Sequence, residues 1–213
     1  MSLVAGCPRC RAAVPLGDGT PRCPVHGLVS RTLWRPEDDA EISYDVFVDH
    51  LGTAGTFPTY LPWPMSPGWS VTDFAVAADD RTWATATCVS GTSELDGPVD
   101  VFVVAEEPGT GLGARCAGLD SSDPGREVGE GQPSARIRIG SQSVSLWILS
   151  TATSDERFDR SVFVGEADGR WLWLVLRPAS AMLLLRDDWI LRDVSSVGPP
   201  LVEVAFGGPR PVW

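Results

Sequence analysis

Lysine is absent from this 213-residue sequence, so all 17 basic side chains are arginines. Histidine is nearly as scarce, because only His26 and His50 are present. Long apolar runs are missing too, and none approaches the roughly 20 residues that a membrane-spanning helix needs. Residues 1–6 have neither the length nor the charge of a secretory signal. These absences predict a cytoplasmic protein without membrane contact.

Cysteine is limited to five residues, an odd number. Three of them lie close together near the N-terminus, whereas Cys88 and Cys116 stand far apart in apolar or glycine-rich surroundings. This is unlike the dense, even-numbered disulfide framework of a small secreted domain. Apolar residues make up 43% of the chain, which is ordinary for a globular protein with a hydrophobic core.

The charge of the chain is acidic overall, with a formal net value of −11. It is also unevenly distributed. Residues 1–35 contain five arginines and one acidic residue, a net charge of +4, whereas residues 36–213 contain 12 basic and 27 acidic residues, a net charge of −15. Such an acidic region repels phosphate backbones. We therefore expect nucleic-acid contact, if there is any, only through the basic N-terminal segment.

A cysteine–histidine pattern opens the chain, with the spacing C-x2-C-x12-C-x2-H at Cys7, Cys10, Cys23 and His26. Two residues between the donors of a pair let a tight turn present both to one ion, and the longer spacing allows a hairpin with residues 17–19 at its tip. Four protein donors leave no open position for catalysis. The pattern predicts a structural Zn²⁺ site in a zinc ribbon. A redox Cys-x-x-Cys is the weaker alternative, because no thioredoxin-like βαβ pattern surrounds it.

The remainder of the chain alternates mostly as strands do, which predicts an α+β fold: a small zinc ribbon followed by a largely antiparallel sheet with a few helices. The expected strands are 70–77, 82–89, 99–105, 136–139, 144–150, 161–165, 171–177 and 189–194. The expected helices are 36–51, with Pro36 in the first turn and Gly52 as the stop, a short turn within 109–119, and 178–186.

Three regions follow from this pattern: a zinc ribbon at residues 1–30, a helix with a proline- and tryptophan-rich connector at 31–68, and an α+β body at 69–213. Within the body, the order of elements reads as two β-β-β-α halves. This order suggests an internal duplication, although such units also arise without common descent.

A glycine-rich loop directly follows the expected strand 99–105. Strand, glycine loop and helix is the order that cradles phosphates. However, the G-x-G-x-x-G spacing fails at Cys116, and the two glutamates would repel a phosphate. We expect a plain tight turn, with a ligand site as the alternative. The candidate ligand residues are Glu106, Glu107, Gly109, Gly111, Gly113 and Arg115.

Nucleophilic catalysis would need His50 as the base for a thiol, either Cys88 or Cys116. Nothing in the sequence brings these residues together. We expect His50 to be a surface or capping residue of its helix and the two cysteines to act as small buried apolar residues. The sequence therefore assigns no catalytic residue.

The connector contains Trp63, Met65 and Trp69 among several prolines, which block helix formation and ladder pairing. These side chains are candidates for an exposed surface that binds a protein partner or a flat ligand. The alternative, which we favour from the sequence, is that they pack the connector onto the sheet.

Several segments together resemble an uncharacterised actinobacterial family of zinc-ribbon-containing proteins of unknown function. They are the paired Cys-Pro-Arg-Cys and Cys-Pro-Val-His-Gly turns, and residues 62–69, 106–115 and 165–173. The resemblance implies an N-terminal zinc site and no particular activity. The family pattern often has glycine after the first Cys-x-x-Cys, where this chain has Arg11.

From these observations we expect a zinc-binding cytoplasmic protein that is a non-enzymatic adaptor or regulator and has a protein partner. One alternative is an enzyme or small-ligand-binding protein with its site near the Gly109–Gly113 loop. The other is nucleic-acid contact through the basic ribbon.

Overall fold

The computed structural model describes residues 3–15, 20–149, 160–186 and 189–211. Strands dominate the described part of the chain. They are β1 (Leu3–Gly6), β2 (Arg22–Cys23), β3 (Gly27–Leu28), β4 (Thr32–Pro36), β5 (Tyr60–Pro62), β6 (Ser70–Ala78), β7 (Thr82–Ser93), β8 (Gly97–Glu106), β9 (Ala135–Ile139), β10 (Gln142–Ile148), β11 (Ser161–Ala167), β12 (Arg170–Arg177) and β13 (Ile190–Asp193). The helices are α1 (Tyr44–Ala54), α2 (Leu112–Ala117) and the 3-10 helices η1 (Ala179–Arg186) and η2 (Pro199–Glu203).

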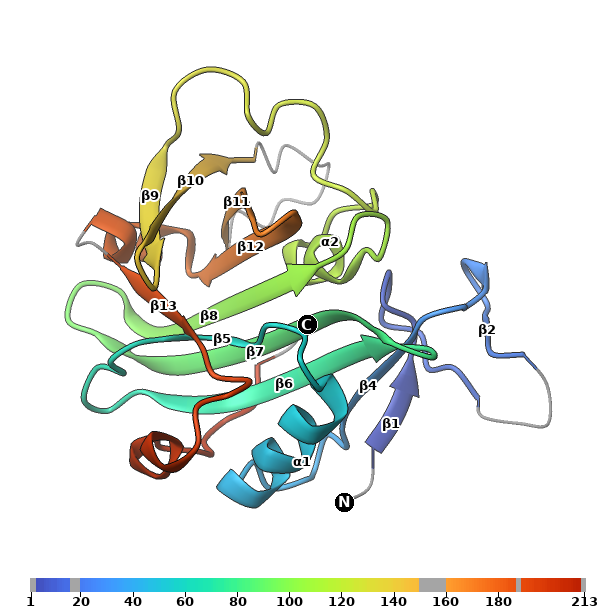
Figure 1. Cartoon of the computed structure of the whole chain (residues 1–213). Helices are drawn as coiled ribbons and strands as arrows, with labels where there is room; N and C mark the ends of the chain where they lie inside the picture. Colours follow the sequence, from blue (N-terminus) through green and yellow to red (C-terminus); the bar gives the residue numbers. More distant parts are fainter. Residues whose placement is uncertain (1–2, 16–19, 150–159, 187–188, 212–213) are drawn as a thin grey trace.

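One sheet of 11 strands organises the molecule, in the order β1-β4-β6-β7-β8-β12-β11-β10-β9-β13-β5 (Figure 1). Its pairs are antiparallel except β13 with β9. The predicted α+β class with a largely antiparallel sheet is therefore confirmed. None of the helices in the described ranges has the length and apolar character needed to cross a membrane.

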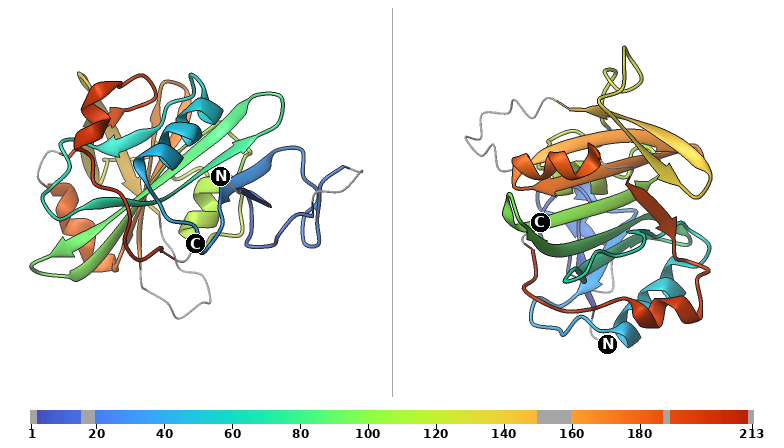
Figure 2. Two further views of the ribbon diagram at one scale, coloured as in Figure 1. Left: turned by 90° about the horizontal axis from the view of Figure 1, so that it is seen from below. Right: turned by 90° about the vertical axis from the view of Figure 1, so that its left-hand side faces the viewer.

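The sheet is strongly curled, as the two views in Figure 2 show. Strand β5, the last in the order, lies against β7, because the hydroxyls of Thr85 and Thr87 donate to the carbonyls of Pro58 and Tyr60 at 2.5 and 2.7 Å. Strands β8 and β12 pair at the centre, where the β6-β7-β8-α2 and β10-β11-β12-η1 segments meet. This arrangement is compatible with the two β-β-β-α halves, and the duplication itself stays a prediction.

Alternating residues of the strands face two different cores, as the period of two requires. Phe74, Val89 and Leu174 belong to the cluster that also contains residues of α1, whereas their neighbours Cys88 and Trp173 belong to the cluster that contains residues of α2. Both clusters are built from fully buried apolar side chains. A large side chain of this kind contributes about 3 kcal/mol to stability, so the body has a substantial core on each face of the sheet.

The predicted strands of the body are confirmed in position, and so is the helix at 178–186, which is the 3-10 helix η1. The predicted helix 36–51 is wrong at both ends. Pro36 ends strand β4, and α1 begins at Tyr44 after Ser43, whose side chain accepts from the Val46 amide. The helix continues through Gly52 to Ala54.

Two physical reasons explain this correction. A serine N-cap satisfies a free amide at the helix start, whereas a proline suits the first turn but has no side-chain acceptor for these amides. Residues 32–36 also have a strand partner on each side, β1 and β6, which no local pattern reveals. The expected hairpin tip at 17–19 and the last residue of the expected strand 144–150 lie outside the described residues.

Candidate metal site

The four cysteine and histidine side chains of the N-terminal pattern converge at one point. Cys7 and Cys10 lie on the turn after β1, Cys23 ends β2, and His26 precedes β3. Their ligand atoms all lie within 4.8 Å of one another. The pairing of β2 with β3, which sets Cys23 opposite Gly27, folds the second pair of donors back toward the first. The head, defined here as residues 3–30, thus forms a group able to hold a metal ion.

The distances between donor atoms agree with tetrahedral zinc. The Cys10 and Cys23 sulphurs are 3.5 Å apart, and His26 Nδ1 lies 3.6 Å from the Cys7 sulphur and 3.7 Å from that of Cys23. A tetrahedral ion with Zn–S of about 2.3 Å and Zn–N of about 2.0 Å places neighbouring donors about 3.5 to 3.8 Å apart. A disulfide needs about 2.05 Å between sulphurs, and all three cysteines are free thiols. The residues present therefore fit Zn²⁺ and not a disulfide.

Backbone amides prepare one of these thiols for a metal. Burial acts to raise the pKa of Cys23, but hydrogen bonds from the backbone of His26 and Val25, together with those to the side chains of His26 and Cys10, outweigh it and lower that pKa to about 6. The Val25 amide lies 3.4 Å from the Cys23 sulphur. At Cys7 burial dominates and raises the pKa to about 11. A bound divalent cation favours the thiolate at each position, because only the deprotonated sulphur is a ligand.

The head is fixed to the body beside the metal donors. Strand β1 pairs with β4 and so joins the main sheet. The guanidinium of Arg115, on α2, donates to the Cys7 carbonyl at 2.7 Å. Arg31 donates to the Thr110 hydroxyl at 3.1 Å and stacks 3.7 Å from the centre of the Trp83 ring. The glycine loop and its helix are thus the surface on which the head rests, a contact between segments about a hundred residues apart that the sequence does not signal.

The charged residues of the predicted ligand loop do not meet at one cavity. Glu106 is fully buried, and its carboxylate accepts from the amides of Leu112 and Gly113 at 2.7 and 3.3 Å. Burial raises its pKa to about 7, against the lowering effect of those two hydrogen bonds. A carboxylate of the protein itself therefore occupies the start of α2, where a phosphate would lie in a phosphate-binding loop.

Glu107 is elsewhere, in ion pairs with Arg170 at 3.3 Å and Arg81 at 3.7 Å. A cavity of about 170 Å³ is lined by residues of both the loop and the head, and its lining includes Gly109 and Thr110 but none of the three charged loop residues. Gly111 is close-packed, since a side chain there would meet Arg9 at 2.9 Å, and Gly113 is packed under the Trp173 ring. The glycines of the loop thus serve close packing in this structure.

The three residues considered for nucleophilic catalysis are separated by the sheet. The expectation that His50 is a surface or capping residue is wrong, because its side chain is 5% exposed and stacks on Phe47 and Phe74 in the core on the α1 side. Burial lowers its pKa to about 3. Cys88 and Cys116 are buried in the cluster on the α2 side. Burial raises the pKa of Cys116 to about 12 and that of Cys88 well above its ordinary value, so both stay protonated.

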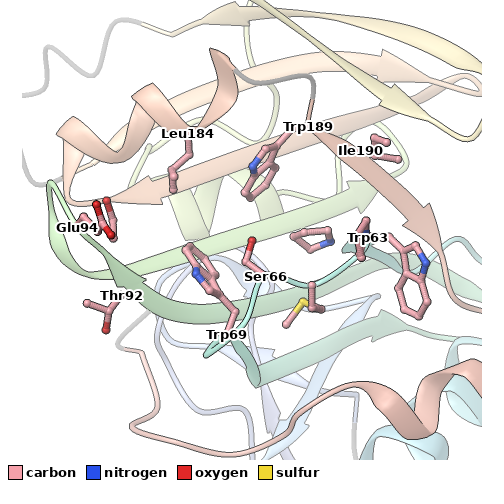
Figure 3. A pocket seen from close by; sticks show the side chains of 12 residues that line it. Trp63, Ser66, Trp69, Thr92, Glu94, Leu184, Trp189 and Ile190 are labelled. Atoms are coloured by element: carbon pink, nitrogen blue, oxygen red, sulfur yellow. The ribbon is translucent and has the colours of Figure 1, made fainter.

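The connector side chains pack on the sheet, as the favoured alternative predicted, and they also line a groove; that the groove binds a partner or a flat ligand stays a prediction. Trp63, Met65 and Trp69 are half-buried and pack on the core cluster of the α1 side. The same three side chains line a surface groove together with Trp189, which precedes β13, and Glu94, at the turn after β7 (Figure 3). Sequence reasoning missed Trp189 and Glu94, because the connection between these distant segments exists only in the folded chain.

A mainly antiparallel sheet with a Cys3His head is the class of protein that the fold and the site define. The sequence matches the family described as a family of unknown function, DUF6758, over residues 1–212, and the chain belongs to that family. No curated protein and no solved structure gives a significant match.

Proposed function

We propose that this protein is a zinc-binding, non-enzymatic adaptor or regulatory protein whose head contacts another protein. The observation that carries this proposal is the convergence of Cys7, Cys10, Cys23 and His26 within 4.8 Å. Zn²⁺ held by these four residues would link the two turns of the head. With four protein donors the ion has no open position, so it would stabilise the head and would not supply a reacting group.

The surface of the head supports a contact role. Val25 and Leu28 are 71% and 62% exposed, in a segment that a metal ion would hold rigid. Arg9, Arg11 and Arg22 are exposed in the same head. Exposed apolar side chains accompanied by arginine are typical of protein interfaces, where arginine is enriched and apolar residues form the centre. A partner with an acidic face would complement this surface.

The charge of the molecule disfavours the nucleic-acid alternative. Three thiolates and a divalent ion lower the net charge of residues 1–35 by one, from +4 to +3, and residues 36–213 carry −15. Salt-sensitive binding of DNA or RNA by the full chain would favour this alternative, because counterion release makes phosphate contacts weaken steeply with salt. The enzyme alternative has less support, since Glu106, Glu107 and Arg115 each contact a different part of the protein.

Metal content tests the first half of the proposal. We expect the purified protein to contain one zinc per chain by atomic emission, and the Cys7→Ser variant to contain much less. Full-length protein that is reproducibly isolated without zinc, and that does not take up zinc from solution, would contradict it.

Two valines of equal exposure test the second part of the proposal, that the head contacts another protein. Val25 on the head and Val202 on η2 are both 71% exposed. We expect Val25→Glu to lose a partner that is captured from a cell extract and cross-linked to the head, and Val202→Glu to retain it. Cys7→Ser should lose the same partner. Capture that is equal for all three variants would argue against a contact role for the head.

A further inference from the structure

A groove of about 440 Å³ lies beside the turn between β7 and β8 (Figure 3), and this turn is at the end of the two strands that is away from the head (Figure 1). This volume lies in the range of about 300 to 1,000 Å³ that is usual for ligand sites. Three parts of the chain that are far apart in the sequence form it: the connector after β5, the turn between β7 and β8, and residues of η1 and of the start of β13. Its lining residues are Pro62, Trp63, Pro64, Met65, Ser66, Trp69, Thr92, Ser93, Glu94, Leu184, Trp189 and Ile190.

The tryptophans of the groove are held in place by backbone contacts. The Trp63 amide donates to the Ile190 carbonyl at 2.9 Å, and the Trp69 amide donates to the Ser66 carbonyl at 3.1 Å. The latter bond closes a Ser-Pro-Gly-Trp turn in which Gly68 has a φ of 80°, as a type II turn requires. Because the backbone of Trp63 and Trp69 is fixed before a ligand arrives, binding has little backbone entropy to overcome at these positions.

One glycine makes room for a groove wall. A side chain at Gly91 on β7 would begin 2.4 Å from the ring of Trp69. The indole therefore lies flat on the strand at this point. Because Gly91 has no side chain, one face of the Trp69 ring packs on the strand. The rest of this half-buried ring is left toward the groove.

The two ends of the groove differ in charge. Figure 3 shows Glu94 at one end and Trp63 at the other, with Trp69 and Trp189 between them. The guanidinium of Arg192 lies 5.0 Å from the centre of the Trp63 ring, so that end carries a positive charge. None of the lining residues named above is basic. A ligand with a positive group is thus attracted to the Glu94 end alone.

Apolar surface continues beyond the groove. Leu95, next to Glu94, is 83% exposed, and Met182 and Leu183 of η1, which precede the lining residue Leu184, are 36% and 37% exposed. Exposed apolar residues beside a half-open groove are typical of a protein contact, whereas a small molecule would use the groove alone. This observation favours a macromolecular occupant.

We infer that the groove binds an extended, proline-containing peptide segment of a partner protein, with a basic residue of that segment against Glu94 and its prolines against Trp63 and Trp69. Proline-rich segments bind in aromatic-lined grooves because their extended helix is formed in advance and their rings are flat and apolar. The inference builds on the proposed adaptor function and specifies its partner class. The groove residues that would bind the peptide are remote from the candidate metal donors.

Fluorescence anisotropy with labelled ten-residue peptides tests this on the zinc-loaded full-length protein. One peptide has three prolines and a terminal arginine, a second has glutamate in place of the arginine, and a third has alanines in place of the prolines. We expect the first to bind about fivefold more tightly than the second and about tenfold more tightly than the third. Tetramethylammonium, a small organic cation, should not displace it.

Matched variants assign the binding to the groove. Trp63→Ala should weaken binding of the first peptide about tenfold, whereas Trp83→Ala, at another half-buried tryptophan near the head, should leave it unchanged. Glu94→Arg should reverse the preference between the arginine and glutamate peptides. Glu166→Arg, at an exposed position on β11, should not. Because Glu94 is exposed, its substitution should not disturb folding, so the Glu94→Arg variant tests the inference even if a tryptophan variant fails to fold.

Equal affinity for the proline and alanine peptides, an unchanged preference in Glu94→Arg, or displacement by tetramethylammonium would overturn the inference. Cys7→Ser separates it from the metal-site proposal. We expect this variant to lose zinc and to retain the peptide, because the groove shares no lining residue with the metal site and the β7–β8 turn beside it lies away from the head (Figure 1).

Discussion

In the head, the buried apolar cluster consists of Cys7, Val14, Cys23 and Val29, and two of these four are candidate metal donors. The body instead has two large clusters, one on each face of its sheet. Burial of the two valines contributes about 4 kcal/mol. Ordering the backbone costs about 1 kcal/mol or more for each residue of the head. The comparison shows that burial stabilises the body but is too small to stabilise the head, so a metal ion bound by the four candidate donors would have to supply the difference.

Removal of a metal donor should give the largest difference between the two regions. For Cys23→Ser we expect zinc to be lost, and with it a binding free energy on the order of 10 kcal/mol that would stabilise the head. Trypsin should then cut at the arginines of the head while the body keeps its melting temperature. Limited proteolysis and thermal unfolding measure the two effects.

The control for this experiment is Cys88→Ala, a buried thiol of the body. It should lower the stability of the body by about 1 to 2 kcal/mol and leave the zinc content unchanged. If Cys23→Ser unfolded the body as strongly as the head, the two regions would not be stabilised separately.

The stability of the body should depend on pH through Glu106, because burial raises the pKa of this carboxyl from 4.5 to about 7. Below about pH 4.5 the carboxyl is neutral in the folded and the unfolded chain. Between about pH 4.5 and pH 7 the unfolded chain releases this proton while the folded chain still holds it, so stability falls as the pH rises over this interval and levels off above it. The loss is about 3 kcal/mol, on the scale of 1.36 kcal/mol for each pKa unit.

Glu106→Gln keeps an acceptor for the amides of α2 and removes the titration. We expect its free energy of unfolding in urea, measured relative to the wild type, to increase by about 3 kcal/mol between pH 4.5 and pH 7.5. His50 gives a trend of opposite sign that is the same in both proteins. Its pKa is lowered to about 3, so its contribution is lost as the pH falls below 6.5 toward 3. Parallel curves for the two proteins would contradict the assignment.

The smallest effect concerns the contact between the two regions. Arg115→Met removes the hydrogen bond from the body to the Cys7 carbonyl, and we expect a loss of about 1.5 kcal/mol in stability. Zinc affinity should fall about tenfold, as it does when groups that orient metal ligands are removed. Competition with a chelator measures this. Arg177→Met, which removes a donor to the Cys116 carbonyl, should reduce stability without a change in zinc affinity.

Local patterns predicted most of the body strands because alternation in the sequence reflects burial of one or both faces. They did not predict β1 and β4, since the pairing that makes residues 32–36 a strand comes from partners on both sides. The burial of His50 was also missed. A lone histidine is polar in the sequence, and only the packing of Phe47 and Phe74 around it makes it part of a core.

By itself, the sequence determined the candidate metal donors, the strand-rich class of the body and the contrast between a basic head and an acidic body. These properties depend on residue type and short spacing, which act within a few residues. Only the tertiary structure decided that Glu106 occupies its own glycine loop, that Arg115 holds the head against the body, and that Trp189 and Glu94 join the connector tryptophans in one groove. The physical reason is that these contacts join segments distant in the chain, and the curl of the sheet brings them together.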